Sequence, residues 1–477
     1  MIPDLNAPPV LAALTGWLQR QPWCPAGHRG RARVVSAPVL VNRLPAGGPA
    51  AVLAVVGAGP VSGWCLVPLG IRPGPPPVAA DHVVRDLDHG CVYDATQDEE
   101  LMRLVLSVFA GAAAPVASGR PSCAVVDAPR PGTGGPACTP VLVDDTYVLK
   151  WYRHVPGGGH PGLELHRALH ALGNGHVSAL HGSLETDVRG SAVTFAALQA
   201  APAGHGALEA AVRSARAVIA GEEPETGFMM TARGLGTCVA RVHADLLAAF
   251  RGARLSSLDL RRIANDMIRQ AHDVPAAVPE LQPYRSRLLA ALAEVADVAA
   301  GREPVVAQRV HSDLRLDNIL LTGQGAVVDF DWVRTAPEQR SRQPVARDVA
   351  GVLRSLEWTA RDQLARAATP GDAAAGQRAG AWVARCRQAF LTGYADAGGR
   401  VDERVLRAYE IDCAVRELVH RAEPAPADVA AICRMLTGPS LRPALPGRGG
   451  NTRSRRSRRT GPADCQAAPD NQFSAVR

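Results

Sequence analysis

Three polar side chains follow one another at spacings that suit one kind of chemistry: Asp313, Asn318 and Asp329. The first two lie in the stretch His-Ser-Asp-Leu-Arg-Leu-Asp-Asn, and the third follows two apolar runs that a glycine-containing turn separates. Phosphoryl transfer needs a carboxylate that accepts the proton of the attacking hydroxyl, and oxygen ligands for the magnesium that holds the ATP phosphates. The pattern predicts Asp313 as the base and Asn318 and Asp329 as ligands of Mg²⁺.

Two neighbours of the base take supporting roles in this interpretation. We expect His311 to hold the loop by hydrogen bonds, because imidazole is rarely the proton acceptor in this chemistry. Arg315, two residues past the base, is placed to neutralise the transferred phosphate. Each piece alone is common in proteins, since a strand that ends in Asp-Phe-Asp is often an exposed turn. The ordered combination is much less frequent by chance.

Lys150 is the only lysine of the chain, although arginine is abundant. It ends the apolar run Tyr-Val-Leu-Lys, which is typical of the strand lysine that pairs with nucleotide phosphates. A lone strand lysine is more often solvated surface, but the pattern at Asp313 favours a functional one. Glu164, in the next predicted helix, is the expected ion-pair partner of Lys150, although a solvent-facing glutamate is the ordinary alternative.

The remaining nucleotide contacts are less sharply marked. The glycine-rich stretch 131–138 could meet phosphates through its amides, or it is a plain flexible loop. We assign Thr139 and Gln199 to nucleotide binding. Asp348 opens a predicted helix, so it either caps that helix or braces the catalytic loop. His243 is expected to be a packing or surface residue.

The composition argues against several other classes of protein. The ten cysteines lack any Cys-x-x-Cys pair, so neither a disulfide framework nor a zinc site is indicated. The formal charge of +7 comes mostly from eight arginines against two aspartates in residues 439–477, which leaves little charge for a nucleic-acid surface elsewhere. No apolar run reaches membrane-spanning length and the N-terminus lacks the layout of a secretion signal. We expect a cytoplasmic monomer with a small-molecule partner.

The surrounding pattern predicts an α+β chain with a protein-kinase-like, two-lobed fold, strands first and helices after. Residues 1–115 would form an N-terminal cap domain, 122–200 a β-rich nucleotide-binding lobe, 204–438 a helical catalytic lobe and 439–477 a disordered basic tail. Thr96 and Glu99 suit a capping box before a helix that ends near Gly111. Further helices are expected at 161–172, 231–250, 258–272, 280–299, 345–363, 378–396 and 403–421.

On these residues the chain resembles the bacterial maltokinase family, relatives of the aminoglycoside phosphotransferases. The resemblance runs to about residue 438 and is carried by ordered short stretches at 17–23, 92–95, 148–150, 163–169, 311–318, 328–331, 347–355, 390–394 and 407–412. It implies transfer of the γ-phosphate of ATP, with Mg²⁺, to a sugar hydroxyl, in maltokinases the anomeric hydroxyl of maltose, which feeds glycogen-type glucan synthesis.

The chain departs from that family in the nucleotide loop at 137–140, at Arg315 and Asn318, and in the C-terminal helix. There Arg416 and His420 stand where the family offers tyrosines to the sugar, so both are candidate substrate residues. Maltose, another sugar, an aminosugar such as glucosamine and an aminoglycoside therefore remain open as acceptors. A nucleotide-binding regulator without turnover is the alternative from another class of protein.

Overall fold

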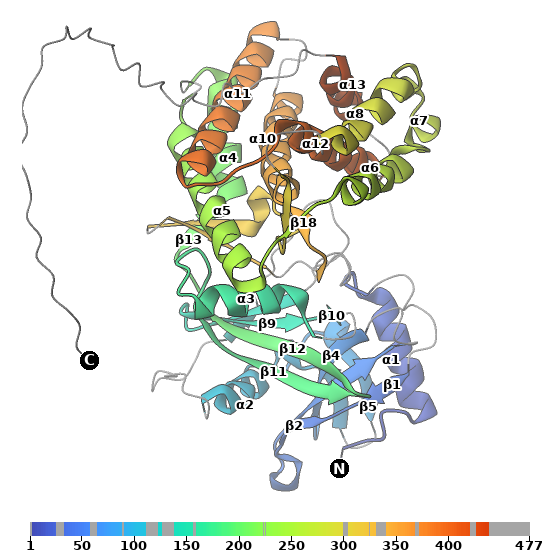
Figure 1. Cartoon of the computed structure of the whole chain (residues 1–477). Coiled ribbons are helices and arrows are strands. Elements are labelled where there is room, and N and C mark those ends of the chain that lie inside the picture. The colour runs from blue at the N-terminus through green and yellow to red at the C-terminus, as the bar shows by residue number, and fades with distance from the viewer. Residues whose placement is uncertain are drawn as a thin grey trace, which may run out of the picture. The chain divides into compact units, whose positions relative to one another are not determined.

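Short apolar runs in the first hundred residues pair into one antiparallel sheet, as Figure 1 shows for the computed structural model of the chain. The structure describes residues 2–24, 33–57, 64–87, 90–110, 123–125, 138–155, 159–222, 224, 226–298, 304–323, 325–330, 340–367, 372–419 and 426–437. Within these residues the sheet has the order β1-β3-β4-β6-β5, with β2 on β3 and β10 on β4. Its strands are β1 (Val34–Ser36), β2 (Val39–Asn42), β3 (Ala50–Val56), β4 (Trp64–Arg72), β5 (Val83–Leu87), β6 (Gly90–Asp94) and β10 (His154–Val155).

Two helices cover this sheet. Helix α1 (Pro8–Arg20) begins on its prolines, which suit a first turn, and buries Trp17 completely. Helix α2 (Glu99–Ala110) is capped by Asp98, whose Oδ1 accepts from the amide of Leu101 at 3.1 Å. The predicted capping box at Thr96 and Glu99 is therefore wrong, because the Thr96 hydroxyl instead donates to Asp94 within the short turn Ala95–Gln97.

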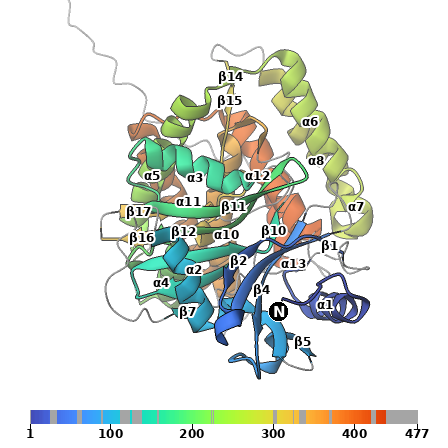
Figure 2. The same ribbon diagram turned by 90° about the horizontal axis from the view of Figure 1, so that it is seen from below.

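A second antiparallel sheet, of order β11-β12-β9-β8-β7, follows. Its strands are β7 (Cys123–Val125), β8 (Cys138–Val143), β9 (Tyr147–Tyr152), β11 (Leu180–Val188) and β12 (Ser191–Ala200). Helix α3 (Pro161–Ala171) lies beside β11 (Figure 2). Its Leu165 and Leu169 are buried in the same hydrophobic core as the helices that come later in the chain. Burial of this apolar face fixes α3, and the polar groups it carries, against the helical part.

Beyond residue 206 the chain is mainly helical, which confirms the α+β class with strands first and helices after. The helices are α4 (Ala207–Ala220), α5 (Met229–Phe250), α6 (Ser257–Ala271), α7 (Val274–Ala277), α8 (Arg285–Asp297), α10 (Ala346–Arg366), α11 (Ala373–Asp396), α12 (Glu403–Val419) and α13 (Pro426–Thr437). Helices α5 and α11 pack closely because Gly236 and Gly393 meet backbone of the opposite helix, where a Cβ would lie 2.0 Å from a carbonyl oxygen.

Two small sheets interrupt the helices. One joins β13 (Gly204–Gly206), β16 (Ile319–Thr322) and β17 (Gly325–Val328), and the other joins β14 (Ala253–Arg254), β15 (Val306–Gln308) and β18 (Gln343–Pro344). The strands β15, β16 and β17 frame the motif that carries Asp313, Asn318 and Asp329.

One strand pairs across the predicted boundary between the first two domains. Strand β10 falls in the predicted nucleotide lobe but pairs with β4 of the first sheet. Met1–Ser440 form one compact unit, and the predicted basic tail and the loop 131–137 lie outside the described residues. Among the helices that the structure describes, none has both the length and the apolar character that a membrane span requires.

Candidate active site

The hairpin β16–β17 brings two of the predicted site residues together. Its register pairs Ile319 with Val328, so Asn318 and Asp329 flank the last pair of the ladder. The amide of Asp329 donates to the carbonyl of Asn318 at 2.8 Å. A carboxylate and an amide oxygen, both hard donors of the kind Mg²⁺ prefers, therefore arise from adjacent backbone positions. This donor set fits a magnesium ion.

The loop that contains Asp313 is held by a buried carboxylate. Asp348, in the first turn of α10, accepts from the amides of His311 and Ser312, each at 2.8 Å. Ser312 has a φ of +75°, a left-handed conformation that costs a non-glycine residue energy and persists where its surroundings impose it. Arg347 adds a bond from Nε to the Ser312 carbonyl at 2.8 Å. Asp348 thus braces the loop that contains Asp313, the sharper of its two predicted roles.

A chain of hydrogen bonds extends from this brace into the helical core. His243 of α5 lies 3.1 Å from Asp348 through Nε2 and 2.9 Å from the Tyr394 hydroxyl through Nδ1. Burial and the charge of Asp348 raise the pKa of Tyr394, so its hydroxyl donates to Nδ1, and Nε2–H is left to donate to Asp348. Burial by itself would raise the pKa of Asp348, but the hydrogen bond from His243 holds it below the usual value.

His243 was expected to be a packing or surface residue, and this interpretation missed its role. The sequence offers no local signal for it, because His243 on α5 and Asp348 on α10 are 105 residues apart and meet only in the folded chain. A second close approach supports the same loop. At Gly351 of α10 a Cβ would lie 2.2 Å from the Leu314 carbonyl oxygen, so only glycine lets α10 approach the residue after Asp313 this closely.

His311 connects the predicted base, Asp313, to the predicted metal ligand, Asp329. Its Nδ1 accepts from the Asp313 amide at 3.3 Å, and its Nε2 donates to the Asp329 carbonyl at 2.8 Å. The imidazole therefore ties the two loops together, as predicted, rather than facing a hydroxyl as a base.

Lys150 reaches this cluster from the second sheet. Its Nζ lies 2.9 Å from Oδ1 of Asp329, and the two side chains are only 12% and 24% exposed. On β9 it stands between Pro140 of β8 and Ala197 of β12, whose small side chains leave room for it along the sheet. The only ammonium group of the chain thus binds the aspartate that the hairpin presents.

Glu164 does not hold Lys150 in this structure, contrary to the prediction. Its two carboxylate oxygens accept from the two terminal nitrogens of Arg309, at 3.1 and 3.2 Å. Arg340 lies 3.9 Å away as a second, weaker partner. The sequence could not separate Lys150 from Arg309, because the choice depends on how α3 packs against the strand that leads into the catalytic loop.

The predicted nucleotide role of the Thr139 side chain is also corrected. Thr139 pairs with Trp151, one residue from Lys150, and therefore points to the opposite face of the sheet. There its Oγ1 accepts from Nε of Arg153, whose Nη2 is bound to Asp94 at 2.7 Å. The hydroxyl belongs to a buried network under the first sheet. Gln199 pairs with Val148 on the Lys150 face and is buried.

Of the two candidate substrate residues, the structure describes only one. Arg416 of α12 binds Asp412 at 2.8 Å, whereas His420 lies outside the described residues. A short path links α12 to the catalytic loop, because Gln343 accepts from Tyr409 at 3.4 Å and from Arg347 at 3.3 Å. Arg315 lies 3.8 Å from Asp317 and is one-third exposed.

One further residue beside the site was missed. His160 caps α3, accepting from the Leu163 amide through Nδ1, and its ring stacks on Tyr152 at 3.8 Å. Burial, and then the charge of Lys150, lower its pKa to about 3. Two residues on, a Cβ at Gly162 would lie 1.8 Å from the Phe330 carbonyl oxygen. The start of α3 therefore rests directly on the backbone beside Asp329.

A strand lysine bound to the aspartate after a β-hairpin, beside a braced loop with a candidate base, defines a phosphotransferase of the protein-kinase-like fold. Residues 17–98 match the maltokinase N-terminal cap domain family, which confirms the resemblance to maltokinases. The glucosamine kinase of Streptacidiphilus jiangxiensis is 29% identical over 426 residues, 84% of this chain and 91% of that protein.

Solved structures of a glucosamine kinase have the same fold. One, crystal form B, has a TM-score of 0.61 at 23% identity and covers 88% of this chain and 98% of its own. Another, in complex with glucosamine, ADP and inorganic phosphate, has the same TM-score and identity over 91% of this chain and 97% of its own. These comparisons confirm the protein-kinase-like fold class that the motif predicted.

Proposed function

We propose that the chain is an ATP- and Mg²⁺-dependent kinase that phosphorylates a hydroxyl of a small sugar. The observation that carries the proposal is the ion pair between Lys150 and Asp329, with 2.9 Å between Nζ and Oδ1. It brings the predicted phosphate-binding lysine onto the predicted metal ligand, next to the loop that holds Asp313.

The chain's own residues have separate tasks in this mechanism. Asp313 accepts the proton as the acceptor oxygen bonds to the γ-phosphorus, and the bond to the bridging oxygen of ADP breaks. Lys150 binds phosphate oxygens, and Arg315 faces the charge of the group in transfer. Asp348 and His311 hold the backbone on which Asp313 and Asp329 stand.

Asn318 and Asp329 would hold the magnesium ion, which when bound neutralises charge on the ATP phosphates. The ammonium of Lys150 lies against the carboxylate of Asp329 and offsets its charge. Gln199 is proposed to contact the nucleotide from the Lys150 face of the sheet.

Glucosamine is the acceptor we favour. The relative that matches 84% of the chain is a glucosamine kinase. A positive charge at Arg416, on the predicted substrate helix, would by itself disfavour a cationic acceptor. In the structure its charge is balanced by Asp412, so this argument loses force.

Maltose is the second candidate, supported by the match of residues 17–98 to the maltokinase cap domain. The match covers the cap and not the residues that would contact the acceptor. It therefore supports a sugar kinase in general more than maltose in particular.

The test is release of ADP from Mg-ATP in the presence of glucosamine, maltose, glucose or trehalose. We expect glucosamine to give the highest kcat/KM, and Asp313→Asn to lower kcat about 10²- to 10⁴-fold, the usual contribution of a general base. The matched control is Asp396→Asn, which removes a half-exposed carboxylate bound to Arg233.

Two outcomes would count against the proposal. Undiminished activity of Asp313→Asn would overturn the mechanism. A thermal shift with Mg-ATP but no ADP release with any sugar would favour the nucleotide-binding regulator instead.

A further inference from the structure

Gln343 lies between the predicted substrate helix α12 and the loop that contains Asp313. Its Oε1 accepts from the Tyr409 hydroxyl of α12 at 3.4 Å and from Nη1 of Arg347 at 3.3 Å. Arg347 in turn donates from Nε to the carbonyl of Ser312, the residue before Asp313, at 2.8 Å. Three side chains therefore connect α12 to the backbone that carries the predicted base.

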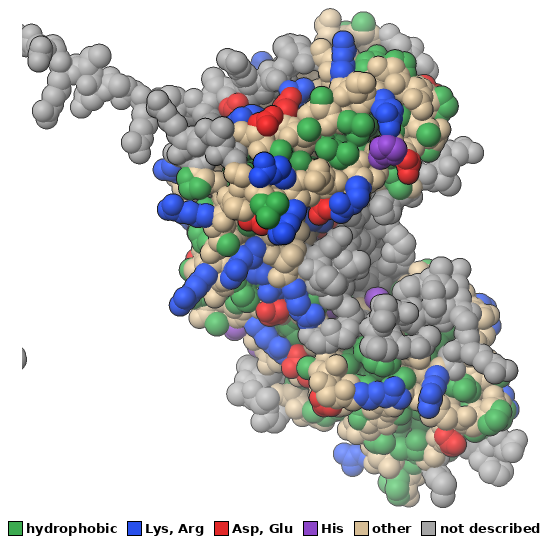
Figure 3. Space-filling view, turned by 45° about the vertical axis from the view of Figure 1, so that its right-hand side comes forward, with side chains coloured by type: hydrophobic (Ala, Val, Ile, Leu, Met, Phe, Trp, Pro, Cys, Tyr) green, Lys and Arg blue, Asp and Glu red, His purple; other side chains and the backbone are tan. Residues whose placement is uncertain are grey.

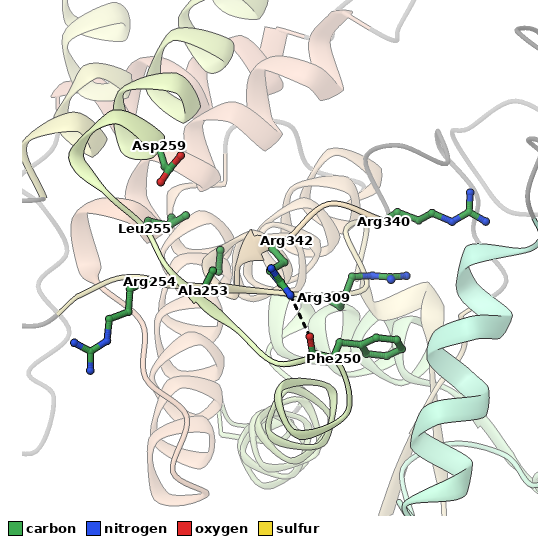
Figure 4. Close-up of a pocket in the computed structure, with 9 residues that line it drawn as sticks. Phe250, Ala253, Arg254, Leu255, Asp259, Arg309, Arg340 and Arg342 are labelled. Atoms are coloured by element: carbon green, nitrogen blue, oxygen red, sulfur yellow. Dashed lines mark hydrogen bonds between the residues drawn. The ribbon is translucent and has the colours of Figure 1, made fainter.

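The short strand β18 fixes the direction of the Gln343 side chain. Gln343 pairs with Gln308 of β15, the strand that leads into the loop of the predicted base. Its Nε2 donates to the Ser341 hydroxyl at 2.8 Å, so the amide group is held at both of its polar atoms. The preceding residue, Arg342, is directed elsewhere, because it lines a surface pocket and donates there to the Phe250 carbonyl at 3.4 Å (Figure 4). The side-chain oxygen of Gln343 is thus held toward α10 and α12.

Arg347 occupies a different environment from the arginines of the open surface. Figure 3 shows basic side chains gathered on one face of the helical part. Arg347 is instead half-buried in the first turn of α10, beside Asp348, which accepts from the amides of His311 and Ser312. A guanidinium group can only donate, and Gln343 and Ser312 each give it an acceptor. A displacement of Gln343 would therefore disturb a guanidinium group that holds the loop.

The α12 end of this connection lies on the helix face that carries the candidate substrate residue. Asp412 and Arg416 follow Tyr409 by three and seven residues, so the three side chains share one face of α12. Tyr409 is only 3% exposed. Burial raises the pKa of its hydroxyl, and the charge of Arg347 acts in the opposite direction. The hydroxyl therefore stays protonated and donates to the glutamine.

We propose that Gln343 is a positioning residue, which holds the loop of Asp313 at a fixed distance from the acceptor site on α12. An acceptor bound by α12 would then present its hydroxyl to a base whose backbone is tied to the same helix. Proton transfer needs that hydroxyl within hydrogen-bond reach, and a displacement of about 1 Å can cost a large factor in rate. This role rests on the proposed kinase function, and Gln343 itself does not touch the reacting atoms.

The test compares kcat and the KM for ATP of Gln343→Leu with those of the wild type, from ADP release. The acceptor is whichever of glucosamine, maltose, glucose and trehalose the wild type phosphorylates fastest. Leucine has a similar size but accepts no hydrogen bond, so the connection is broken. We expect kcat to fall about tenfold, the size of one hydrogen bond to a charged group, while the KM for ATP changes by less than about twofold.

Gln343→Glu is the conservative variant that should restore most of the lost kcat. Its carboxylate keeps two acceptor oxygens at the same place, so it can still accept from Tyr409 and Arg347. A role limited to filling space would not distinguish glutamate from leucine in this way. Melting temperatures of both variants separate the effect on turnover from any effect on stability.

Tyr409→Phe tests the other end of the connection. It removes one buried oxygen and keeps the ring, so it also replaces Gln343→Leu should that variant fail to fold. We expect kcat to fall about threefold, less than for Gln343→Leu, because the bond is long at 3.4 Å. Added to Gln343→Leu, it should have no further effect on kcat, because the two residues act through the same contact.

Gln363→Leu is the matched control. Gln363 lies sixteen residues beyond Arg347 on α10, and it is also buried. Its Oε1 accepts from Nε of Arg216 at 3.2 Å, and its Nε2 donates to Asp362 at 2.9 Å. The same kind of contact is therefore lost far from the loop of the predicted base. This variant should keep the kcat and the KM of the wild type, whatever its melting temperature.

Three results would contradict the proposal. Equal kcat values for Gln343→Leu and Gln363→Leu would overturn the positioning role and leave the sugar kinase in place. A loss of kcat that follows the melting temperature, and that Gln343→Glu does not reverse, would make the role purely structural. A wild type that phosphorylates none of the four sugars would overturn the proposed function, and the role of Gln343 with it.

Discussion

Lys150 and Asp329 are 179 residues apart in the chain, and Nζ of the lysine lies 2.9 Å from Oδ1 of the aspartate. The lysine comes from the middle strand β9 and the aspartate from the end of the hairpin β16–β17. Both side chains are largely buried, so their attraction is screened less than on an open surface. The phosphates of a bound nucleotide would be attracted to Lys150, and its metal ion would be attracted to Asp329. We therefore take this pair as the marker of the triphosphate site.

Lys150→Met tests that assignment. The variant removes the ammonium that binds Asp329 and the proposed phosphate contact, so the KM for ATP should rise and kcat should fall. A combined loss in kcat/KM of about 10²- to 10³-fold is expected, as for other single electrostatic groups of active sites. Initial rates of ADP release over a range of ATP concentrations measure both quantities.

Lys150→Arg and Arg167→Met give the comparison for this variant. A planar guanidinium does not reproduce a compact ammonium, so Lys150→Arg should recover little activity. Arg167→Met removes a half-exposed cation of α3 that binds Glu185, and it should retain activity. An unchanged KM for ATP in Lys150→Met would mean that the lysine does not bind the phosphates.

Asp348→Asn tests the brace of the catalytic loop. An asparagine can accept from only one of the two amides of His311 and Ser312, and its own amide group then faces the other donor. We expect the free energy of unfolding to fall by about 1–3 kcal/mol, the cost of a buried unsatisfied donor, together with a fall in kcat. Urea denaturation and initial rates measure the two effects.

Asp372→Asn is the matched control, because Asp372 also accepts from two amides, those of Ala374 and Ala375, at the start of α11. Both amides donate to the same oxygen, Oδ1, which an asparagine retains, and the side chain is 39% exposed to water. A loss of at most about 1 kcal/mol is expected there. Equal losses in both variants would show that the burial of Asp348 is not what matters.

Gly162→Ala tests the contact between α3 and the backbone beside Asp329. The new Cβ would lie 1.8 Å from the Phe330 carbonyl oxygen, so α3 or the Asp-Phe-Asp segment must shift. We expect lower stability and a loss of activity larger than the loss of stability alone explains. Thermal melting and ADP release, measured on the folded variant, separate these effects.

Gly234→Ala is expected to have the opposite effect on stability. Gly234 lies in α5 with no atom within 4 Å of the new Cβ, so alanine should stabilise the helix by about 0.5–1 kcal/mol. A destabilised Gly234→Ala, or a Gly162→Ala as stable and active as the wild type, would contradict the steric explanation.

The sequence predicted the parts of the site whose geometry is local. Asp313, Asn318 and Asp329 lie on one loop and one hairpin, so their spacing fixes most of their arrangement. Lys150 was found because no other lysine exists in the chain. The α+β order of strands and helices follows from apolar periodicity, which is also a local property.

The parts that failed depend on register and on packing between distant segments. Thr139 was misassigned because one step along β8 moves a side chain to the other face of the sheet. Glu164 binds Arg309 instead of Lys150 because of the way α3 packs. His243 and Asp348 are 105 residues apart, and no spacing rule joins them.

His160 gives stability a pH dependence that can be worked out from its environment. Burial and the nearby ammonium of Lys150 lower its pKa from 6.5 to about 3. In the unfolded chain His160 therefore binds a proton below pH 6.5, whereas in the folded chain it binds one only below about pH 3. The contribution of His160 to folding is fully present above pH 6.5 and is lost progressively as the pH falls through this window.

His160→Asn tests this prediction, since asparagine can still cap α3 but does not titrate. Between the two pKa values the stability of the wild type should fall more steeply by up to about 1.4 kcal/mol per pH unit, which corresponds to one proton. Urea denaturation at several pH values gives both slopes. Parallel curves for His160→Asn and the wild type would mean that His160 takes up its proton in the folded chain as readily as in the unfolded one.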